Sequence, residues 1–213
     1  MESIEKPKFE GLEKIYPQRE EEKEEEVLFP EDLAYLYKFI SKGLTQKDIA
    51  LVLAQCKIQR AETKKEIEGF ASTYLEAKEL TGDLEKLKNL KSQEIEGYIL
   101  RWGELIDREN KKGFRIVPAT FGDGSKALDH RKIPHAIEMF CEGFSSYLAD
   151  SIDDERLSAD ILYKEFEKIH PFEDGNGRVG HLLWALAVTS RDGEWPDKLP
   201  PNIFDEKRNS TNL

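Results

Sequence analysis

The nine residues from His170 to Arg178 constrain the fold of this chain more than any other segment. They read His-Pro-Phe-Glu-Asp-Gly-Asn-Gly-Arg and separate two apolar stretches, Leu157 to Phe166 and Val179 to Val188. Proline disfavours helical dihedrals in the residue before it, and glycines tolerate positive φ. The pattern therefore predicts two helices joined by a tight loop, with His170 exposed at the end of the first helix.

The loop has the composition of an anion-binding site. Gly175, Asn176 and Gly177 can turn successive backbone N–H groups toward one point, and the helix that follows adds its free N–H groups and the positive end of its dipole. Arg178 supplies a permanent cation with a fork geometry suited to phosphate oxygens. These residues predict a cradle for phosphate groups.

Two further side chains of the run suit phosphate chemistry. His170 has an imidazole that can titrate near neutral pH and act as a general base. Asp174 is a hard carboxylate ligand beside the cradle, and Mg²⁺ is commonly held by one or two carboxylates together with substrate phosphates. A base, a metal ligand and an anion cradle thus fall within one predicted helix-loop-helix.

The run from His170 to Arg178 resembles the signature of the Fic domain family, H-P-F-x-D/E-G-N-G-R-x-x-R, at nine consecutive positions. Upstream, Gly113-Phe114-Arg115 is similar to the step that precedes the segment called the flap in this family, here Ile116 to Gly122. The resemblance is good from Gly113 to about Val188. It implies an all-α, Fic-type helical domain with a small β-hairpin flap, preceded here by a helical N-terminal extension.

The resemblance implies a protein adenylyltransferase that moves AMP from ATP to a Ser, Thr or Tyr hydroxyl of a target protein. His170 would take the proton from that hydroxyl, and Asp174 would hold the Mg²⁺ that bridges the α- and β-phosphates. Residues Gly175 to Gly177 would cradle these phosphates, and Arg178 would neutralise the leaving pyrophosphate. The target protein would dock along the flap.

The chain departs from the family signature at its twelfth position, where His181 replaces a second arginine that usually reaches the distal phosphate. An imidazole is shorter and is charged only part of the time. His181 is therefore a candidate nucleotide contact of a different kind. Two alternatives stay open, a Fic-type transferase of another phosphate-containing group and a Fic-fold binding module that has lost catalysis.

Many Fic proteins carry a regulatory helix with the motif Ser/Thr-x-x-x-Glu-Gly/Asn. Lys64 to Gly69 has the expected place in the chain, with Lys64 where Ser or Thr is usual, and makes Glu68 the candidate regulator. Ser92 to Gly97 fits the letters but comes later, so Glu96 is the alternative. Either glutamate could instead belong to a solvated helix face.

Composition and charge limit the partners and the cellular location that we expect for the protein. A net charge of −11 in 213 residues argues against nucleic-acid or anionic-membrane partners, because phosphate surfaces attract basic proteins. Cys56 and Cys141 are too few for a disulfide framework, and no apolar run has the length of a membrane span. We expect a cytoplasmic protein, with secretion as an effector as another possibility.

Apolar periodicity divides the chain into four parts. We expect an acidic, disordered tail over residues 1–27, a helical extension over 28–90, the Fic core over 91–195 and an irregular tail over 196–213. Predicted helices cover Ala34 to Ser41, a segment capped by Thr45, Glu66 to Leu80 and Glu94 to Arg108, and others begin at Pro134, Asp153 and Gly177.

Overall fold

The computed structural model describes residues 34–61, 63–107, 113–121, 124–150 and 157–201. Helices form nearly all of its regular structure, which confirms the predicted all-α class. In chain order they are η2 (Ala34–Leu36), α1 (Tyr37–Ile40), α2 (Gln46–Ile58), α3 (Lys64–Leu80), α4 (Leu84–Lys88), α5 (Ser92–Ile106), η3 (His130–Lys132), α6 (Ile133–Leu148), α7 (Ala159–Ile169) and α8 (Asn176–Asp192).

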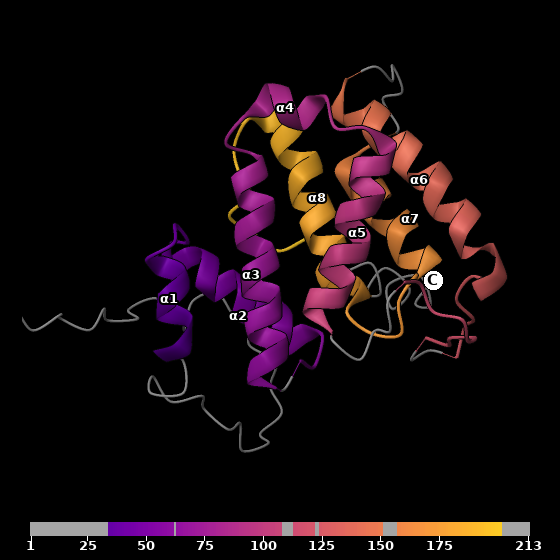
Figure 1. Ribbon diagram of the computed structural model, residues 1–213, viewed down its shortest axis with the longest axis horizontal. Coiled ribbons are helices and arrows are strands. Elements are labelled where there is room, and N and C mark those ends of the chain that lie inside the picture. The colour runs from indigo at the N-terminus through magenta and orange to yellow at the C-terminus, as the bar shows by residue number, and fades with distance from the viewer. Residues whose placement is uncertain (1–33, 62, 108–112, 122–123, 151–156, 202–213) are drawn as a thin grey trace, which may run out of the picture.

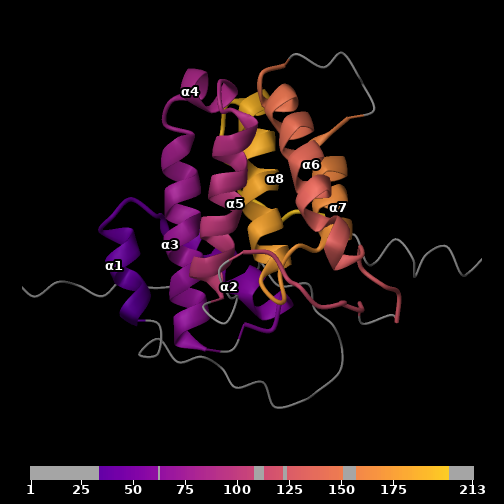
Figure 2. The same ribbon diagram turned by 45° about the vertical axis from the view of Figure 1, so that its right-hand side comes forward.

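Helix α8 is the centre of the bundle. Figures 1 and 2 show it behind α3 and α5, with α6 and α7 along its other side. Every residue from Asn176 to Ala187 is buried, as expected for a helix that has neighbours all round. The helix that follows the signature loop is thus held from several directions, which fixes the position of the loop.

Side-chain caps explain where helices α2 and α3 of the extension begin. Thr45 and Asp48 form a capping box at the start of α2, as the predicted N-cap at Thr45 required. Thr63 and Glu66 form a second one at the start of α3. Both boxes satisfy backbone N–H groups that have no acceptor within the helix.

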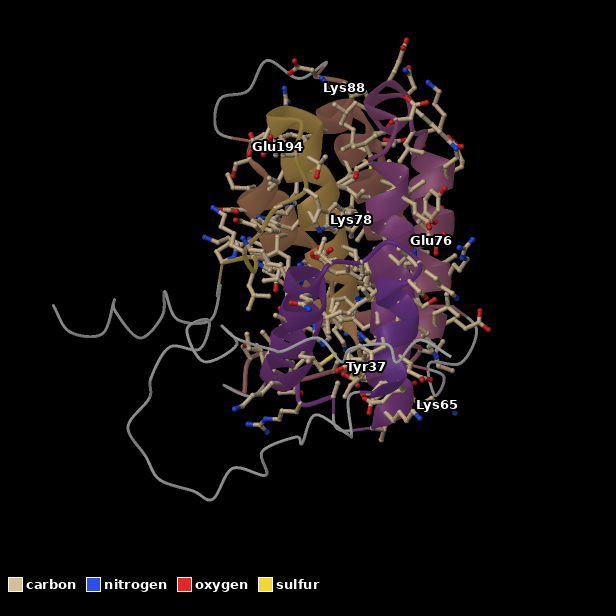
Figure 3. The ribbon with its side chains drawn as sticks, turned by 90° about the vertical axis from the view of Figure 1, so that its left-hand side faces the viewer. Tyr37, Lys65, Glu76, Lys78, Lys88 and Glu194 are labelled. Atoms are coloured by element: carbon tan, nitrogen blue, oxygen red, sulfur yellow. The ribbon has the colours of Figure 1, made fainter. Side chains whose placement is uncertain are left out.

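A close helix crossing joins the extension to the rest of the bundle. At Gly69 of α3, an added Cβ would lie 2.2 Å from the carbonyl oxygen of Leu105 on α5, so only glycine allows this approach. The apolar side chains of both halves form one cluster of buried residues. In Figure 3, Lys65 marks the end of α3 at which the site lies, while Lys88 and Glu194 lie at the opposite end of the molecule.

Two expectations about elements were wrong. Helix α7 begins at Ala159 after the N-cap Ser158, so Leu157 precedes it, and Asp153 lies outside the described residues. The predicted β-hairpin flap is not seen. The described part of this segment has an isolated antiparallel bridge between Thr120 and Lys126. Backbone bonds from Phe121 to Ser125 and from Ala127 to Ala119 flank this bridge, but the described residues form no strand.

Other expectations fall partly beyond the described residues. The predicted acidic tail, residues 1–27, lies wholly outside them, as does most of the segment 196–213. The described part of that last segment, up to Pro201, is not helical. Among the described helices, none combines the length and apolar character that a bilayer span requires.

Candidate active site

Four helix ends meet at one end of the bundle and surround the signature loop. They are the end of α7, the start of α8, the end of α5 and the start of α3, which lie together at the lower end of the bundle in Figure 1. Helix α2 crosses at the same end (Figure 2). The structure thus brings the predicted residues from His170 to Arg178 together with residues of the extension.

His170 terminates α7, as its position before proline predicted. Its backbone adopts the left-handed conformation, with φ +50°, and its N–H donates to the Phe166 carbonyl at 3.0 Å. The ring is half-buried rather than exposed, because Phe121 packs edge-on against it with ring centroids 4.9 Å apart. The predicted exposure of His170 was therefore wrong, although its place at the helix end was right.

The surroundings of His170 favour the neutral imidazole. Burial and the nearby Arg115 cation lower its pKa below the usual value, while the Glu167 backbone and the Asp174 carboxylate act in the opposite direction. Its Nδ1 atom is buried, with no partner in hydrogen-bonding geometry in the described structure. A neutral imidazole at pH 7 is the form in which histidine can accept a proton.

The loop after His170 is braced by its own side chains. Phe172 is buried against Gly103 of α5, where an added Cβ would lie 2.5 Å from the ring, so this side chain anchors the loop in the core. The Asn176 side chain accepts from the Phe172 N–H and donates to the Phe172 carbonyl, both at 2.9 Å. Asn176 therefore supports the loop through its side chain and can offer its backbone N–H to an anion.

The cradle has the positive φ that its glycines predicted at Gly175, whereas Gly177 lies within α8. Gly175 is left-handed, with φ +81°, and an added Cβ there would lie 2.8 Å from Ile106. Helix α8 begins at Asn176, so N–H groups of the first turn point out of the helix without an intrahelical acceptor. These groups and the positive end of the helix dipole are available to a phosphate at this place.

Helix α2 of the extension lines the other side of the cradle. The Gln55 side chain donates to the Gly177 carbonyl at 3.1 Å, in a buried position. The Gln59 carboxamide packs so closely on Gly177 that an added Cβ would lie 2.3 Å from its oxygen. Sequence reasoning missed both glutamines, since no motif relates them to a loop more than a hundred residues away.

Arg178 is fully buried, and its charge is already paired. Its Nη2 atom lies 2.9 Å from the Asp174 carboxylate and 3.6 Å from that of Glu66 at the start of α3. Its Nε and Nη1 atoms are buried without partners in the described structure. A buried guanidinium whose N–H donors are not all used favours the binding of a further anion.

His181 does not reach the cradle. Its ring is fully buried among aromatic side chains, with centroids 5.8 Å from Phe70, 5.7 Å from Tyr74 and 6.3 Å from Trp184. Burial lowers its pKa to about 3, and both ring nitrogens lack partners in the described structure. The sequence suggested a nucleotide contact at this position, and the structure places a neutral core residue there.

Neither predicted regulatory glutamate contacts the signature loop. Glu68 pairs with Lys38 at 2.9 Å, and Glu96 lies ten residues before the end of α5, roughly 15 Å along the helix from Ile106. Glu66 contacts Arg178 instead. Two residues along a helix differ by about 200°, so Glu66 and Glu68 point to nearly opposite sides.

Asp174 fits the role of a magnesium ligand. Its side chain is about half exposed at the mouth of the cradle, held by Arg178, and offers a hard oxygen next to the place where phosphates would bind. Among the described residues, no cluster of three or more His, Cys, Asp and Glu side chains could enclose a metal without a substrate. This donor set suits Mg²⁺ bound jointly with phosphates.

The fold and the site define a helical-bundle protein in which a glycine turn at the start of a buried helix lies beside a partly buried histidine. A model of the Fic/DOC family matches residues 80–188, just over half of the chain, and the chain belongs to this family. Members of the family are commonly transferases. No curated protein matches the chain.

Proposed function

We propose that this protein is a Fic-type adenylyltransferase, which moves AMP from ATP to a Ser, Thr or Tyr hydroxyl of a target protein. The observation that carries the proposal is the short connection between His170 and the cradle. His170 lies at the end of α7, and the backbone N–H groups of Gly175 to Gly177 lie at the start of α8. A hydroxyl activated at His170 would lie beside a phosphate held at the start of α8.

In the proposed reaction, the target hydroxyl gives its proton to the neutral imidazole of His170. The hydroxyl oxygen forms a new bond to the α-phosphorus of ATP, the bond between that phosphorus and the bridging oxygen breaks, and pyrophosphate leaves. Backbone N–H groups of the cradle and the Arg178 guanidinium stabilise the charge on the phosphate oxygens. Such electrostatic stabilisation and positioning are the main contributions that a protein makes to phosphate-group transfer.

Asp174 would hold Mg²⁺, which when bound would supply positive charge to the α- and β-phosphates. Arg178 now pairs with Asp174 and Glu66. A nucleotide would take over part of the Arg178 fork, and its free Nε and Nη1 donors allow this without breaking both ion pairs. The chain thus provides a cation for phosphate and a carboxylate for the metal side by side.

The target protein would dock along the flap. Ile116 and Val117 are exposed apolar residues of this segment, 76 % and 47 % accessible. Large apolar side chains in contact with water favour burial by a partner. The flap lies next to His170 through the contact between Phe121 and the imidazole, so a docked chain would run past the proposed base.

The buried position of His181 favours a second candidate, a transferase whose donor holds its reacting group through a diphosphate. The described part of the site offers Arg178 as a buried cation, and His181 adds no cation for a third phosphate. ADP and ATP should then bind with similar affinity in calorimetric titrations. ATP binding more than tenfold tighter than ADP would count against the diphosphate donor.

The proposal is tested by incubating the full chain with Mg²⁺, a lysate and ATP labelled on its α-phosphate. We expect label on protein, and a loss of at least about 100-fold in His170→Ala because general-base catalysis contributes that much. His135→Ala, at an exposed site on α6, is the matched control and should transfer normally. Label from γ-labelled ATP would indicate phosphate transfer instead. Absence of α-label together with absence of nucleotide binding would indicate a non-catalytic binding module.

A further inference from the structure

Arg115 connects the flap to the turn that carries His170. Its guanidinium is almost fully buried and donates only to backbone carbonyl oxygens in the bonds that the structure defines. Nε donates to His170 at 2.7 Å and Nη1 to Val117 at 2.8 Å, while Nη2 donates to Leu128 at 2.5 Å and to Ile169 at 3.4 Å. One side chain thus joins the end of α7 to both sides of the flap.

The carbonyls that Arg115 binds need such a partner. Ile169 is the last residue of α7, so no N–H group of the helix donates to its carbonyl, which lies at the negative end of the helix dipole. A cation at this place is favourable, and the fork of an arginine can serve several carbonyls at once. The Arg115 backbone adds a further bond, from its N–H to the Pro171 carbonyl at 2.8 Å.

His170 also needs support for its backbone conformation. A residue with a Cβ is strained in the left-handed region, and such strain persists only where the surroundings over-determine it. The carbonyls on both sides of the strained φ and ψ, those of Ile169 and His170, accept from the same guanidinium. Phe121, which packs on the imidazole, belongs to the loop that Arg115 closes between Val117 and Leu128.

We propose that Arg115 is a positioning residue of the transfer site, which fastens the flap to the turn at His170 and thereby fixes the imidazole relative to the cradle and to a docked target. Only the measurement of activity in the test of this proposal depends on the proposed function. Arg115 does not contact the cradle in the bonds that the structure defines, so its effect falls on the proton-accepting side of the reaction rather than on nucleotide binding.

The test uses Arg115→Lys in the full chain, because lysine keeps the charge and loses the fork. We expect kcat for transfer to fall about 100-fold, as for a displacement of reacting groups by about 1 Å, with the KM for ATP changed less than twofold. Arg131→Lys, an exposed arginine paired with Asp129 close to the flap, is the matched control and should keep its kcat. Unchanged kcat in Arg115→Lys would overturn the proposal.

A second readout does not depend on activity. Amide hydrogen exchange of residue 115, bonded to Pro171, and of His170 should quicken at least tenfold in Arg115→Lys, while amides in the middle of α8 keep their protection. If the wild type transfers nothing but these amides quicken, the proposed function fails and the positioning role stands. Unchanged exchange would overturn the positioning role whether or not the protein transfers AMP.

A second variant covers the case in which Arg115→Lys does not fold. Phe121→Ala removes the ring that packs on His170 and leaves the guanidinium bonds in place. We expect the residue 115 and His170 amides to keep their protection in this variant within about threefold. Loss of that protection would mean that packing of the flap, and not Arg115, holds the turn, and would also overturn the proposal.

Discussion

Acid should destabilise this protein through His181, and replacing that residue should remove the effect. In the unfolded chain the pKa of a histidine is about 6.5, and burial in the folded protein lowers that of His181 to about 3. The folded state therefore excludes a proton that the unfolded state binds. The penalty is absent well above pH 6.5, grows as the pH falls from about 6.5 to about 3, and is constant below that.

The size of the effect follows from the shift. A pH of 4.5 is two units below the pKa of the histidine in the unfolded chain, which is then protonated, while His181 in the folded protein is still neutral. The loss in the free energy of unfolding is therefore about 2.7 kcal/mol. At pH 7 it is only about 0.2 kcal/mol by the same relation. Between these two values the free energy of unfolding should lose about 2.5 kcal/mol to this residue alone, a large share of the stability of an ordinary domain.

Urea unfolding of His181→Met, followed by circular dichroism from pH 4.5 to 7.5, measures this quantity. Methionine has a similar volume, fills irregular space among aromatic rings and does not titrate. The advantage of the variant over the wild type should grow by about 2.5 kcal/mol as the pH falls from 7 to 4.5. His135→Met, which alters an exposed histidine, should show no such trend. A constant difference between His181→Met and wild type at every pH would refute the reasoning.

Three further predictions concern neighbours of the site. Burial raises the pKa of Glu167 to about 8, so its folded form keeps a proton that the unfolded chain loses above pH 4.5. Glu167→Gln should therefore reduce the decline in the free energy of unfolding between pH 5 and pH 8 by about 3.5 kcal/mol in urea titrations. Glu66→Gln keeps the capping box and removes the pair with Arg178, worth about 1 kcal/mol, so calorimetry should show nucleotide binding about fivefold tighter, and weaker binding would contradict the role of that pair. Gly103→Ala should destabilise the fold by about 1–3 kcal/mol in thermal melts, because its Cβ would overlap the Phe172 ring, and an unchanged melting temperature would contradict this.

The sequence predicts those parts of the site that depend on neighbours along the chain. The turn at His170 follows from Pro171, the left-handed Gly175 follows from the glycine itself, and the start of α2 follows from Thr45 and Asp48. Each of these features depends on residues within about one helical turn. The local conformation of such a segment can be predicted before the fold is known.

The contacts that the sequence does not predict join distant segments. Arg115 and His170 are 55 positions apart, and the pairing of Arg178 with Glu66 depends on how the start of α3 packs against α8. Glu68 fits a letter pattern, but the helical rotation of about 200° between it and Glu66 decides which carboxylate faces the site. The family resemblance implied a hairpin flap, yet its described residues form one bridge, and beyond it the Arg115 side chain binds the carbonyls of Val117 and Leu128.

The burial of His181 explains why the site ends at Arg178. On α3, Glu66, Phe70 and Tyr74 follow one another at four-residue spacing and therefore form one stripe, which faces Arg178 and His181 on α8. The first pair of this interface is ionic and the rest is aromatic. An imidazole fits the aromatic part only as a neutral group, which its lowered pKa reflects. Because α3 belongs mostly to the segment before residue 80, where the family match begins, the extension and the replacement at position 181 form one packed unit. The extension thus packs against the helix that carries Arg178 and His181 and holds His181 in the core.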